Sequence, residues 1–329
     1  MTLLISKRLG VACFFIFLIV FQVNAVLASS ETPKDNSSLE KGFEYLKNGD
    51  YDRAGKFFNK AIEGKPDDRG AYNGLGLVFY YQGKLEKAEE AYRKALTLDP
   101  SHPGAYAHLG EIFLKRQEWI EAEKWHQFAL EKGAEHPRVL NNMAMIKMKL
   151  GKSEEAVELL RRVIDLEPNN NDYLINFGDA LLRIGDYQGA IDAYLKVSKE
   201  NDKDSRFLRN LGYAYFATGN KQQGIELTKK SLKVEPEQKE GWANLGAFYL
   251  VTGDYELAKE NLETAISKNP EDAMAYADLG ATYEKLGDKK MAIQSFQKAA
   301  EINPDKIEYQ NELERLKKIS ILDVANTNS

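Results

Sequence analysis

Small residues recur at a fixed spacing along most of this chain. With a period of about 34 residues, one slot holds glycine or alanine, and so does a second slot further along the same unit. The first series is Gly42, Gly76, Gly110, Ala144, Gly178, Gly212, Gly246 and Gly280, and the second is Ala54, Ala88, Ala122, Ala156, Ala190, Gly224, Ala258 and Ala292. A period of this length indicates stacked copies of one supersecondary unit rather than a single closed core.

The stretch from Gly241 to Pro270 shows what the repeated unit is. It contains, in order, Trp242, Leu245, Gly246, Tyr249, Ala258, Leu262, Ala265 and Pro270. This resembles the tetratricopeptide repeat (TPR), in which each unit forms two antiparallel helices. With the closing proline near the end of each unit, repeats begin without insertion or deletion at Asp35, Arg69, Pro103, Pro137, Asn171, Ser205, Lys239 and Ala273.

The resemblance implies an all-α fold, a TPR α-solenoid that winds as a right-handed superhelix of antiparallel helix pairs. Eight repeats would cover residues 35–304, followed by a capping helix over 305–319 and a disordered tail over 320–329. Between the helices of most repeats stands a glycine, as expected where a helix ends in a left-handed residue, but the third repeat has Gln117 there.

The segment over 1–28 differs from the rest of the chain. Lys7 and Arg8 precede an apolar run from Leu9 to Phe21, and small residues precede Ser29, which predicts a signal peptide cleaved after Ala28. An uncleaved anchor is the alternative, and it would be the chain's one contact with a membrane. Residues 29–34 form a polar linker. Both interpretations predict an exported protein, in the periplasm or cell envelope, secreted, or anchored facing outward.

Signatures of catalysis are missing from the sequence. We find no phosphate-binding loop, nucleophile elbow or HExxH motif, and the single cysteine, Cys13, lies in the N-terminal segment. The net charge of -5, without a basic run, argues against nucleic-acid binding. Four histidines cluster around the third repeat, at 102, 108, 126 and 136, but their spacing does not form a metal site. The sequence therefore predicts a non-enzyme without cofactor or metal.

In TPR proteins the first helices of successive repeats line a concave groove, chiefly through positions 2, 5, 6, 9, 12 and 13. Position 6 carries an asparagine in four consecutive repeats, namely Asn142, Asn176, Asn210 and Asn244. This resembles the asparagine ladder with which some TPR superhelices hold extended peptides. Asparagine is also the commonest consensus residue there, so a purely structural origin stays open.

The groove around these asparagines is expected to change character along the chain. Repeats three to six project the basic residues Lys115, Arg138, Lys149, Arg183, Arg206 and Arg209, interrupted by Glu111, Asp172 and Asp179, with Tyr213 and Phe216 beside the last. This favours an acidic or carboxylate-bearing ligand. Further on, Ala243, Ala247 and Leu250 leave room for a bulky apolar side chain.

The leading hypothesis is an exported TPR scaffold that binds extended protein segments in its groove, in envelope assembly or secretion. Two alternatives stay open. One is a structural TPR array that assembles with copies of itself into a homo-oligomer, and the other is a regulatory subunit of an envelope enzyme such as a polysaccharide synthase. The repeat pattern does not identify the partner.

Overall fold

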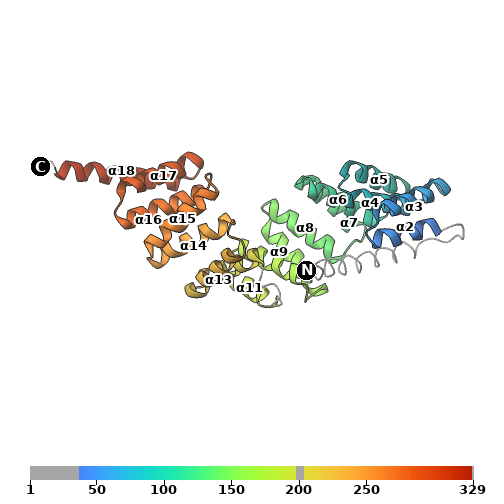
Figure 1. Cartoon of the computed structure of the whole chain (residues 1–329), viewed down its shortest axis with the longest axis horizontal. Helices are drawn as coiled ribbons and strands as arrows, with labels where there is room; N and C mark the ends of the chain where they lie inside the picture. Colours follow the sequence, from blue (N-terminus) through green and yellow to red (C-terminus); the bar gives the residue numbers. More distant parts are fainter. Residues whose placement is uncertain (1–36, 198–203, 328–329) are drawn as a thin grey trace, which may run out of the picture. The chain divides into compact units, whose positions relative to one another are not determined.

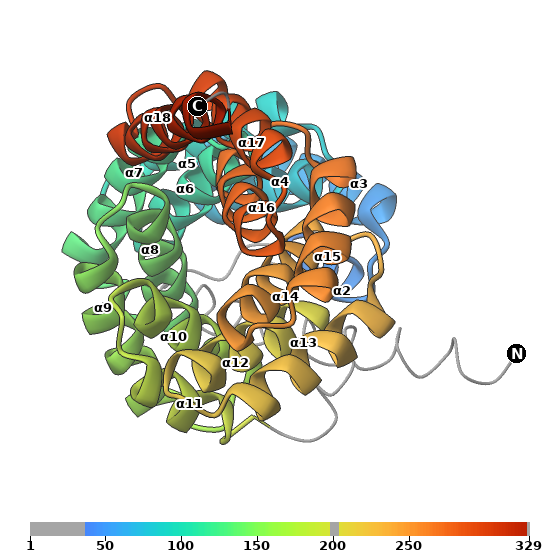
Figure 2. The ribbon, with the colours of Figure 1, turned by 90° about the vertical axis from the view of Figure 1, so that its left-hand side faces the viewer.

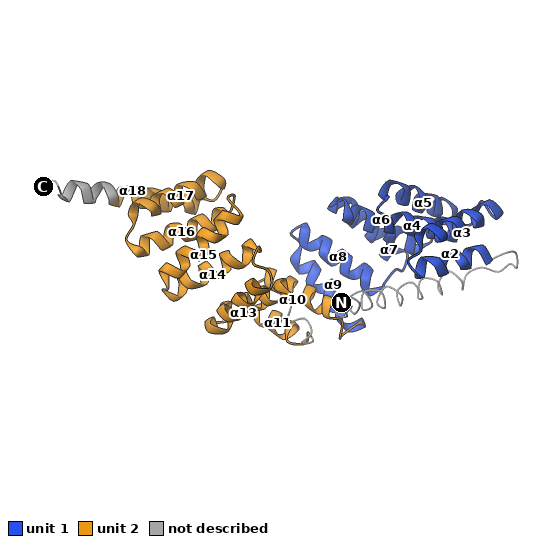
Figure 3. Cartoon of the chain, in the orientation of Figure 1, with its two compact units in different colours: residues 1–166 blue, residues 167–329 orange. Residues whose placement is uncertain are grey.

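The computed structural model describes residues 37–197 and 204–327, with side chains described to residue 319. The expected signal peptide and polar linker lie outside these residues. The described chain is helical, with no strand among its residues, and it divides into two compact units (Figures 1 and 3). Residues up to Leu166 belong to unit 1, and residues from Glu167 onward belong to unit 2. No helix among the described residues has both the length and the apolar character needed to cross a membrane.

Helices alternate as the first and second members of each repeat. The first helices are α2 (Ser37–Lys47), α4 (Arg69–Tyr81), α6 (Pro103–Lys115) and α8 (Pro137–Lys149) in unit 1, and α10 (Asn171–Arg183), α12 (Ser205–Ala217), α14 (Lys239–Thr252) and α16 (Ala273–Leu286) in unit 2. The second helices are α3 (Tyr51–Gly64), α5 (Leu85–Leu98), α7 (Trp119–Glu131), α9 (Ser153–Leu166), α11 (Tyr187–Tyr194), α13 (Lys221–Val234), α15 (Tyr255–Lys268) and α17 (Lys289–Ile302). The last helix is α18 (Ile307–Thr327).

Capping acids and prolines mark the first residues of several of these helices. Asp68 and Asp272 accept hydrogen bonds from the backbone N–H groups of Ala71 and Ala275, at 3.1 and 3.0 Å, and so cap α4 and α16. Pro103 and Pro137 each occupy the first helical position, where the missing N–H has no consequence.

The two helices of a repeat are held together at the slot of small residues. A Cβ on Gly76 would lie 2.5 Å from Cε1 of Tyr92, and one on Gly178 would lie 2.3 Å from Cε1 of Tyr194. The facing side chain follows the small one at the same separation in every repeat. This partner series consists of Phe58, Tyr92, His126, Leu160, Tyr194, Thr228, Leu262 and Phe296, all buried. The small residue therefore leaves room for the facing buried side chain.

Turns between the paired helices use the left-handed conformation. Gly83 has φ of 75° and Gly253 has φ of 90°. Gln117 takes the same conformation with φ of 60°, and it is the only non-glycine residue with positive φ among those described. The turn geometry is thus kept in the third repeat although its glycine is missing.

Large side chains fill the space between helices, and some keep a polar tip outside the core. Trp242 Nε1 donates a hydrogen bond to the carbonyl of Pro236 at 2.7 Å, and the Tyr106 hydroxyl donates to that of Pro100 at 3.1 Å. These two aromatic rings are half-buried, whereas Leu140 and Leu174 at the equivalent positions are fully buried. Each aromatic residue thereby ties a first helix to the loop before it.

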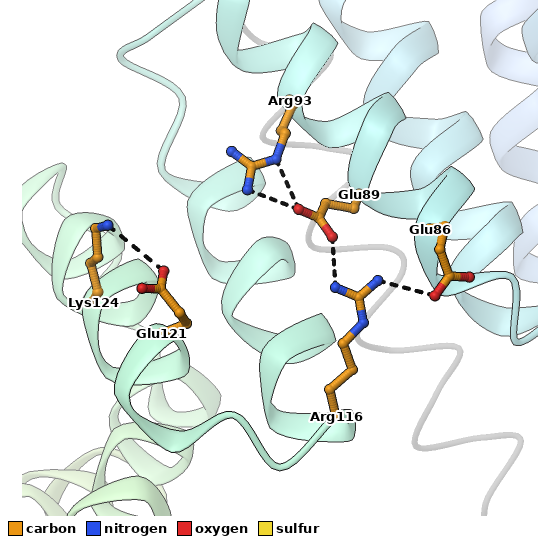
Figure 4. A network of polar contacts seen from close by, with 6 residues as sticks. All are labelled: Glu86, Glu89, Arg93, Arg116, Glu121 and Lys124. Atoms are coloured by element: carbon orange, nitrogen blue, oxygen red, sulfur yellow. Dashed lines mark hydrogen bonds and ion pairs between the residues drawn. The ribbon is translucent and has the colours of Figure 1, made fainter.

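Ion pairs near the surface join the second and third repeats. Arg116 lies 2.7 Å from Glu89 and 3.3 Å from Glu86, and Glu89 also accepts from Arg93 (Figure 4). Lys124 and Glu121 pair separately within α7 at 3.7 Å. Such surface pairs each contribute about 0–1 kcal/mol, so they assist the apolar packing rather than replace it.

The end of the chain differs from its expectation. The capping helix was expected to stop at Ile319 and to be followed by a disordered tail, but α18 continues to Thr327. Its start packs on unit 2 through Tyr309 and Leu316, which are 7% and 1% exposed. No proline or glycine interrupts the segment after Leu316, so the backbone can continue as a helix to Thr327.

We predict that Gly76→Ala destabilises unit 1, because its Cβ would overlap the buried ring of Tyr92. Overpacking of this kind costs about 1–3 kcal/mol, measurable by urea unfolding followed by circular dichroism. Ala144 with Leu160 shows which pair the slot accepts, so the double variant Gly76→Ala/Tyr92→Leu should be more stable than the sum of its single effects. Unchanged unfolding of Gly76→Ala would contradict the packing.

Candidate functional site

The first helices of each unit carry a set of side chains that share one side. We call the residues at positions 2, 5, 6, 9, 12 and 13 of the first helices the inner face of that unit, since this spacing keeps them on one side of a helix. Successive first helices lie side by side, α4 next to α6 in unit 1 and α12, α14 and α16 in unit 2 (Figures 1 and 2).

Glu111 is a buried carboxylate on the inner face of unit 1. Nη2 of Arg138 lies 2.9 Å from its Oε1, and Nδ1 of His108 lies 3.6 Å from its Oε2. Burial by itself would raise the pKa of Glu111, but the positive charge of Arg138, followed by His108, lowers that pKa to about 2. Glu111 is therefore ionised at physiological pH and orients the guanidinium of Arg138.

The basic side chains expected in repeats three to six are mostly engaged within the chain. Arg206 lies 3.6 Å from Asp179, and Arg209 lies 3.6 Å from Glu240. Lys115 and Lys149 lie over the rings of Tyr80 and Trp119, with 4.2 and 5.7 Å to the centroids. Arg183 is exposed and forms no ion pair with a described residue. The inner faces thus carry less free positive charge than the sequence suggested.

A spacing that the sequence analysis did not use explains two of these pairs. Glu111 and Arg138 are separated along the chain by the same distance as Asp179 and Arg206. In both pairs an acid at position 9 meets an arginine at position 2 of the next repeat. The carboxylates were noticed only as interruptions of a basic surface, although this spacing could have identified them as its partners.

The four asparagines at position 6 are not equivalent. Asn210 donates to Oδ1 of Asp179 at 2.8 Å and accepts from Nε of Arg209 at 3.2 Å. The hydroxyl of Tyr194 donates to the same Asp179 oxygen at 2.6 Å, and Asn176 also has a partner. The half-buried side chains of Asn142 in unit 1 and Asn244 in unit 2 have no hydrogen bond to a described residue. Each carboxamide of this second pair keeps its full capacity for a ligand.

The inner face of unit 2 becomes apolar and open from α12 to α16. Tyr213, Val251 and Met274 have exposed fractions of 39%, 59% and 60%. Phe216 stacks on Phe248 with 3.8 Å between ring centroids and forms one wall. Ala243, Ala247 and Leu250 of α14 are half-buried, and Ala243 and Leu250 pack against the core of unit 2.

Asp278 occupies position 6 of α16, after the three asparagines of unit 2. Its carboxylate forms no ion pair or hydrogen bond with a described residue. Burial raises its pKa to about 6, Asp272 adds to the increase, and Lys306 opposes it. Asp278 is mostly ionised at neutral pH, although its burial and the charge of Asp272 disfavour the ionised form.

The described residues contain no group of three or more histidine, cysteine or acidic side chains placed to hold a metal ion. His126 is instead the large residue that faces Gly110, and its Nδ1 lies 3.0 Å from the Ala122 carbonyl. His108 stacks on Tyr92 with 5.1 Å between centroids. These two histidines therefore have packing roles.

Family models confirm the repeat that the sequence resembles. Tetratricopeptide-repeat models match residues 177–238, 240–272 and 273–306. A further TPR model, described as "Cilia and flagella-associated protein 70 C-terminal domain", matches residues 32–206, more than half of the chain. The chain belongs to the tetratricopeptide repeat family. No curated protein sequence matches this TPR protein.

Solved structures similar to this TPR protein include YrrB, "a TPR protein with an unusual peptide-binding site", at 26% identity and a TM-score of 0.50. That match covers 54% of this chain and 92% of YrrB. The Cut9–Hcn1 hetero-tetramer of the APC/C matches at 16% identity and a TM-score of 0.62, over 86% of this chain and 56% of that one. A TPR protein from Parabacteroides merdae matches at 18% identity and a TM-score of 0.48, over 86% and 98%.

We predict that Arg138→Met destabilises this TPR protein at neutral pH, because it leaves Glu111 buried without its cation. The expected loss is about 2–4 kcal/mol, reduced because part of Arg138 is exposed. Since the pair lowers the pKa of Glu111 from 4.5 to about 2, the stabilisation is complete above pH 4.5 and is lost as the pH falls toward 2. Urea unfolding at several pH values measures this. The double variant Glu111→Gln/Arg138→Met should recover part of the loss, and equal stability of the single variant at neutral pH would exclude the pair's role.

We also predict that Asp278→Asn raises the melting temperature near pH 7.5. Because the folded-state pKa, about 6, exceeds the ordinary 3.8, ionisation opposes folding, and stability is lost as the pH rises through this interval. Removing the charge should contribute about 1–3 kcal/mol near neutral pH and almost nothing near pH 3.5, as calorimetry would show. Glu260→Gln, which removes one exposed charge from α15, serves as the control. A stabilisation of the same size at both pH values would show that ionisation is not its cause.

Proposed function

We propose that this TPR protein is a non-enzymatic scaffold that binds extended protein segments along its inner face. The observation that carries the proposal is the inner face of α14 and α16, which holds the unpaired carboxamide of Asn244 and the exposed apolar side chains of Val251 and Met274. A carboxamide has one acceptor and two donors, which suits the alternating groups of a peptide backbone. Packed helices are about 8–10 Å apart and a strand advances about 3.3 Å per residue, so neighbouring first helices would meet about every third ligand residue.

The likeness to YrrB supports this reading, because that protein is described as having a peptide-binding site and shares 26% identity with this chain. The pairing inside both units refines the binding surface that we propose. Arg138, Arg206 and Asn210 are held by carboxylates of the chain, whereas Asn244, Val251 and Met274 are available. We therefore assign the main contact to α14 and α16.

We further propose that the scaffold acts outside the cytoplasm, in envelope assembly or secretion. This part rests on the sequence of residues 1–28 alone, where two basic residues precede an apolar run. Fusion of residues 1–34 to a reporter enzyme that is active only after export tests it. Export of the reporter, lost when the apolar run is interrupted by charges, is the expected result; a reporter retained in the cytoplasm would exclude this location.

Binding itself is tested by selecting short displayed peptides on the full-length protein and measuring their affinities by fluorescence anisotropy. Val251→Glu should weaken binding of the selected peptides by at least about tenfold, since it places a charge in the apolar contact. Leu257→Glu is the matched control, because Leu257 is a 43% exposed leucine on the second helix α15. Equal effects of the two substitutions, or a failure to select any peptide, would overturn the proposal.

The exposed apolar side chains favour one alternative, a homo-oligomer in which the inner face of unit 2 meets another copy. Light scattering over a range of protein concentrations distinguishes the two functions. A monomer at all concentrations supports the peptide scaffold. Self-association that Val251→Glu abolishes and Leu257→Glu leaves intact supports the structural array.

A further inference from the structure

The charge at Asp278 makes the last position of the asparagine series different in kind. Asn176, Asn210 and Asn244 precede it at the same position of α10, α12 and α14. A carboxylate has the acceptors of a carboxamide but no donor, and it adds a full negative charge. A neutral peptide backbone would therefore form fewer hydrogen bonds at α16 than at α14, because Asp278 offers no donor.

Asp278 forms no ion pair with a described residue, although the charge of Lys306 acts on it. Lys306, which opposes the increase in its pKa, lies over the ring of Tyr309 at 5.2 Å from the centroid. Arg315 of α18 is engaged with Glu284 at 2.6 Å. Lys285 is exposed at position 13 of α16 and forms no ion pair with a described residue, and Asp272 adds negative charge from the start of the helix. Within the described chain, Asp278 is thus a partly buried acid without a partner.

The other acids on this part of the inner face are already paired. Glu240 faces Arg209 at 3.6 Å, and Glu284 faces Arg315. Asp278 is therefore the inner-face carboxylate of α14 and α16 that has no ion pair among the described residues, and a cationic group of a ligand could form one.

The surroundings of Asp278 define what must accompany that cation. Met274 is 60% exposed on the same helix, and Val251 is 59% exposed on the neighbouring α14. Ala243 and Ala247 of α14 and Ala281 of α16 are half-buried and small, which leaves space above the helices. A long aliphatic stem with a charged end, flanked by apolar residues, matches this combination of open apolar surface and single acid.

We propose that the inner face of unit 2 selects extended protein segments in which a lysine, flanked by apolar residues, pairs with Asp278. This inference rests on the proposed peptide-binding function and names its ligand class. It reverses the acidic ligand that the basic residues of repeats three to six suggested. Most inner-face arginines of those repeats face carboxylates of the chain, whereas Asp278 forms no ion pair with a described residue.

The test uses the full-length protein and three fluorescent peptides that share one apolar sequence and differ at a central residue. That residue is lysine, the uncharged norleucine of similar length, or glutamate. Near pH 7.5 the lysine peptide should bind about tenfold more tightly than the norleucine peptide, and the glutamate peptide more weakly than both. Asp278→Asn should reduce the preference for lysine to within about twofold, whereas Glu260→Gln should leave it unchanged.

The pH dependence of peptide binding provides a second test. Protonation of Asp278 near pH 5 should remove the preference for lysine in the wild-type protein, and the Asp278→Asn variant should show no such change. Asp272 and Lys306 are the charged groups that act on Asp278 in the free protein, so Lys306→Met should strengthen the dependence on the ligand's charge.

The outcomes separate this inference from the function on which it rests. If the three peptides bind equally and Val251→Glu weakens all of them, the scaffold function stands and the role of Asp278 is refuted. If none of the three binds although displayed peptides of other sequence do, the ligand class is wrong. If no peptide of any kind binds, both proposals fail.

Discussion

The close approach of the two helices in each repeat is the contact on which this molecule depends. A glycine or alanine in the first helix admits a buried side chain of the second, and Gly212 with Gly224 brings the backbones close enough that the partner is only Thr228. This contact uses one side of each first helix. Some positions on the opposite side are also buried, such as His108 and Glu111, whereas others, such as Val251 and Met274, are exposed. The exposed positions can change with less effect on the fold, so they are the ones where recognition can reside.

The inner-face residues fall into two groups. Some use their charges and hydrogen-bonding groups on one another, and others leave them available to a ligand. Glu111 with Arg138, and Asp179 with Arg206 and Asn210, consume one another's charges and hydrogen-bonding groups. On α14 and α16 many inner-face side chains are short or apolar, Glu240 and Glu284 are paired, and Asp278 forms no ion pair with a described residue. We expect such a surface to bind a ligand more tightly when the ligand supplies a positive charge opposite Asp278.

Much of the fold could be predicted because it depends on local chemistry. From α4 to α16 the first helices begin at the residues where the register of the sequence places the start of a repeat, since prolines, capping acids and turn glycines act within a few residues of themselves. The pairing of Arg138 and the pKa of Asp278 depend instead on groups that meet only after repeats stack. Gln117 also shows where prediction from residue type fails, because the stacked repeats impose a left-handed turn that glutamine disfavours.

The constant register has a consequence for how such a molecule can change. Since the small residue and its buried counterpart keep the same separation in every copy, the inner-face residues of one repeat could be transplanted into another while the contact that pairs its helices remains intact. Binding specificity can then change one repeat at a time. The repeat that carries Asp278 could be moved, duplicated or lost separately from the others.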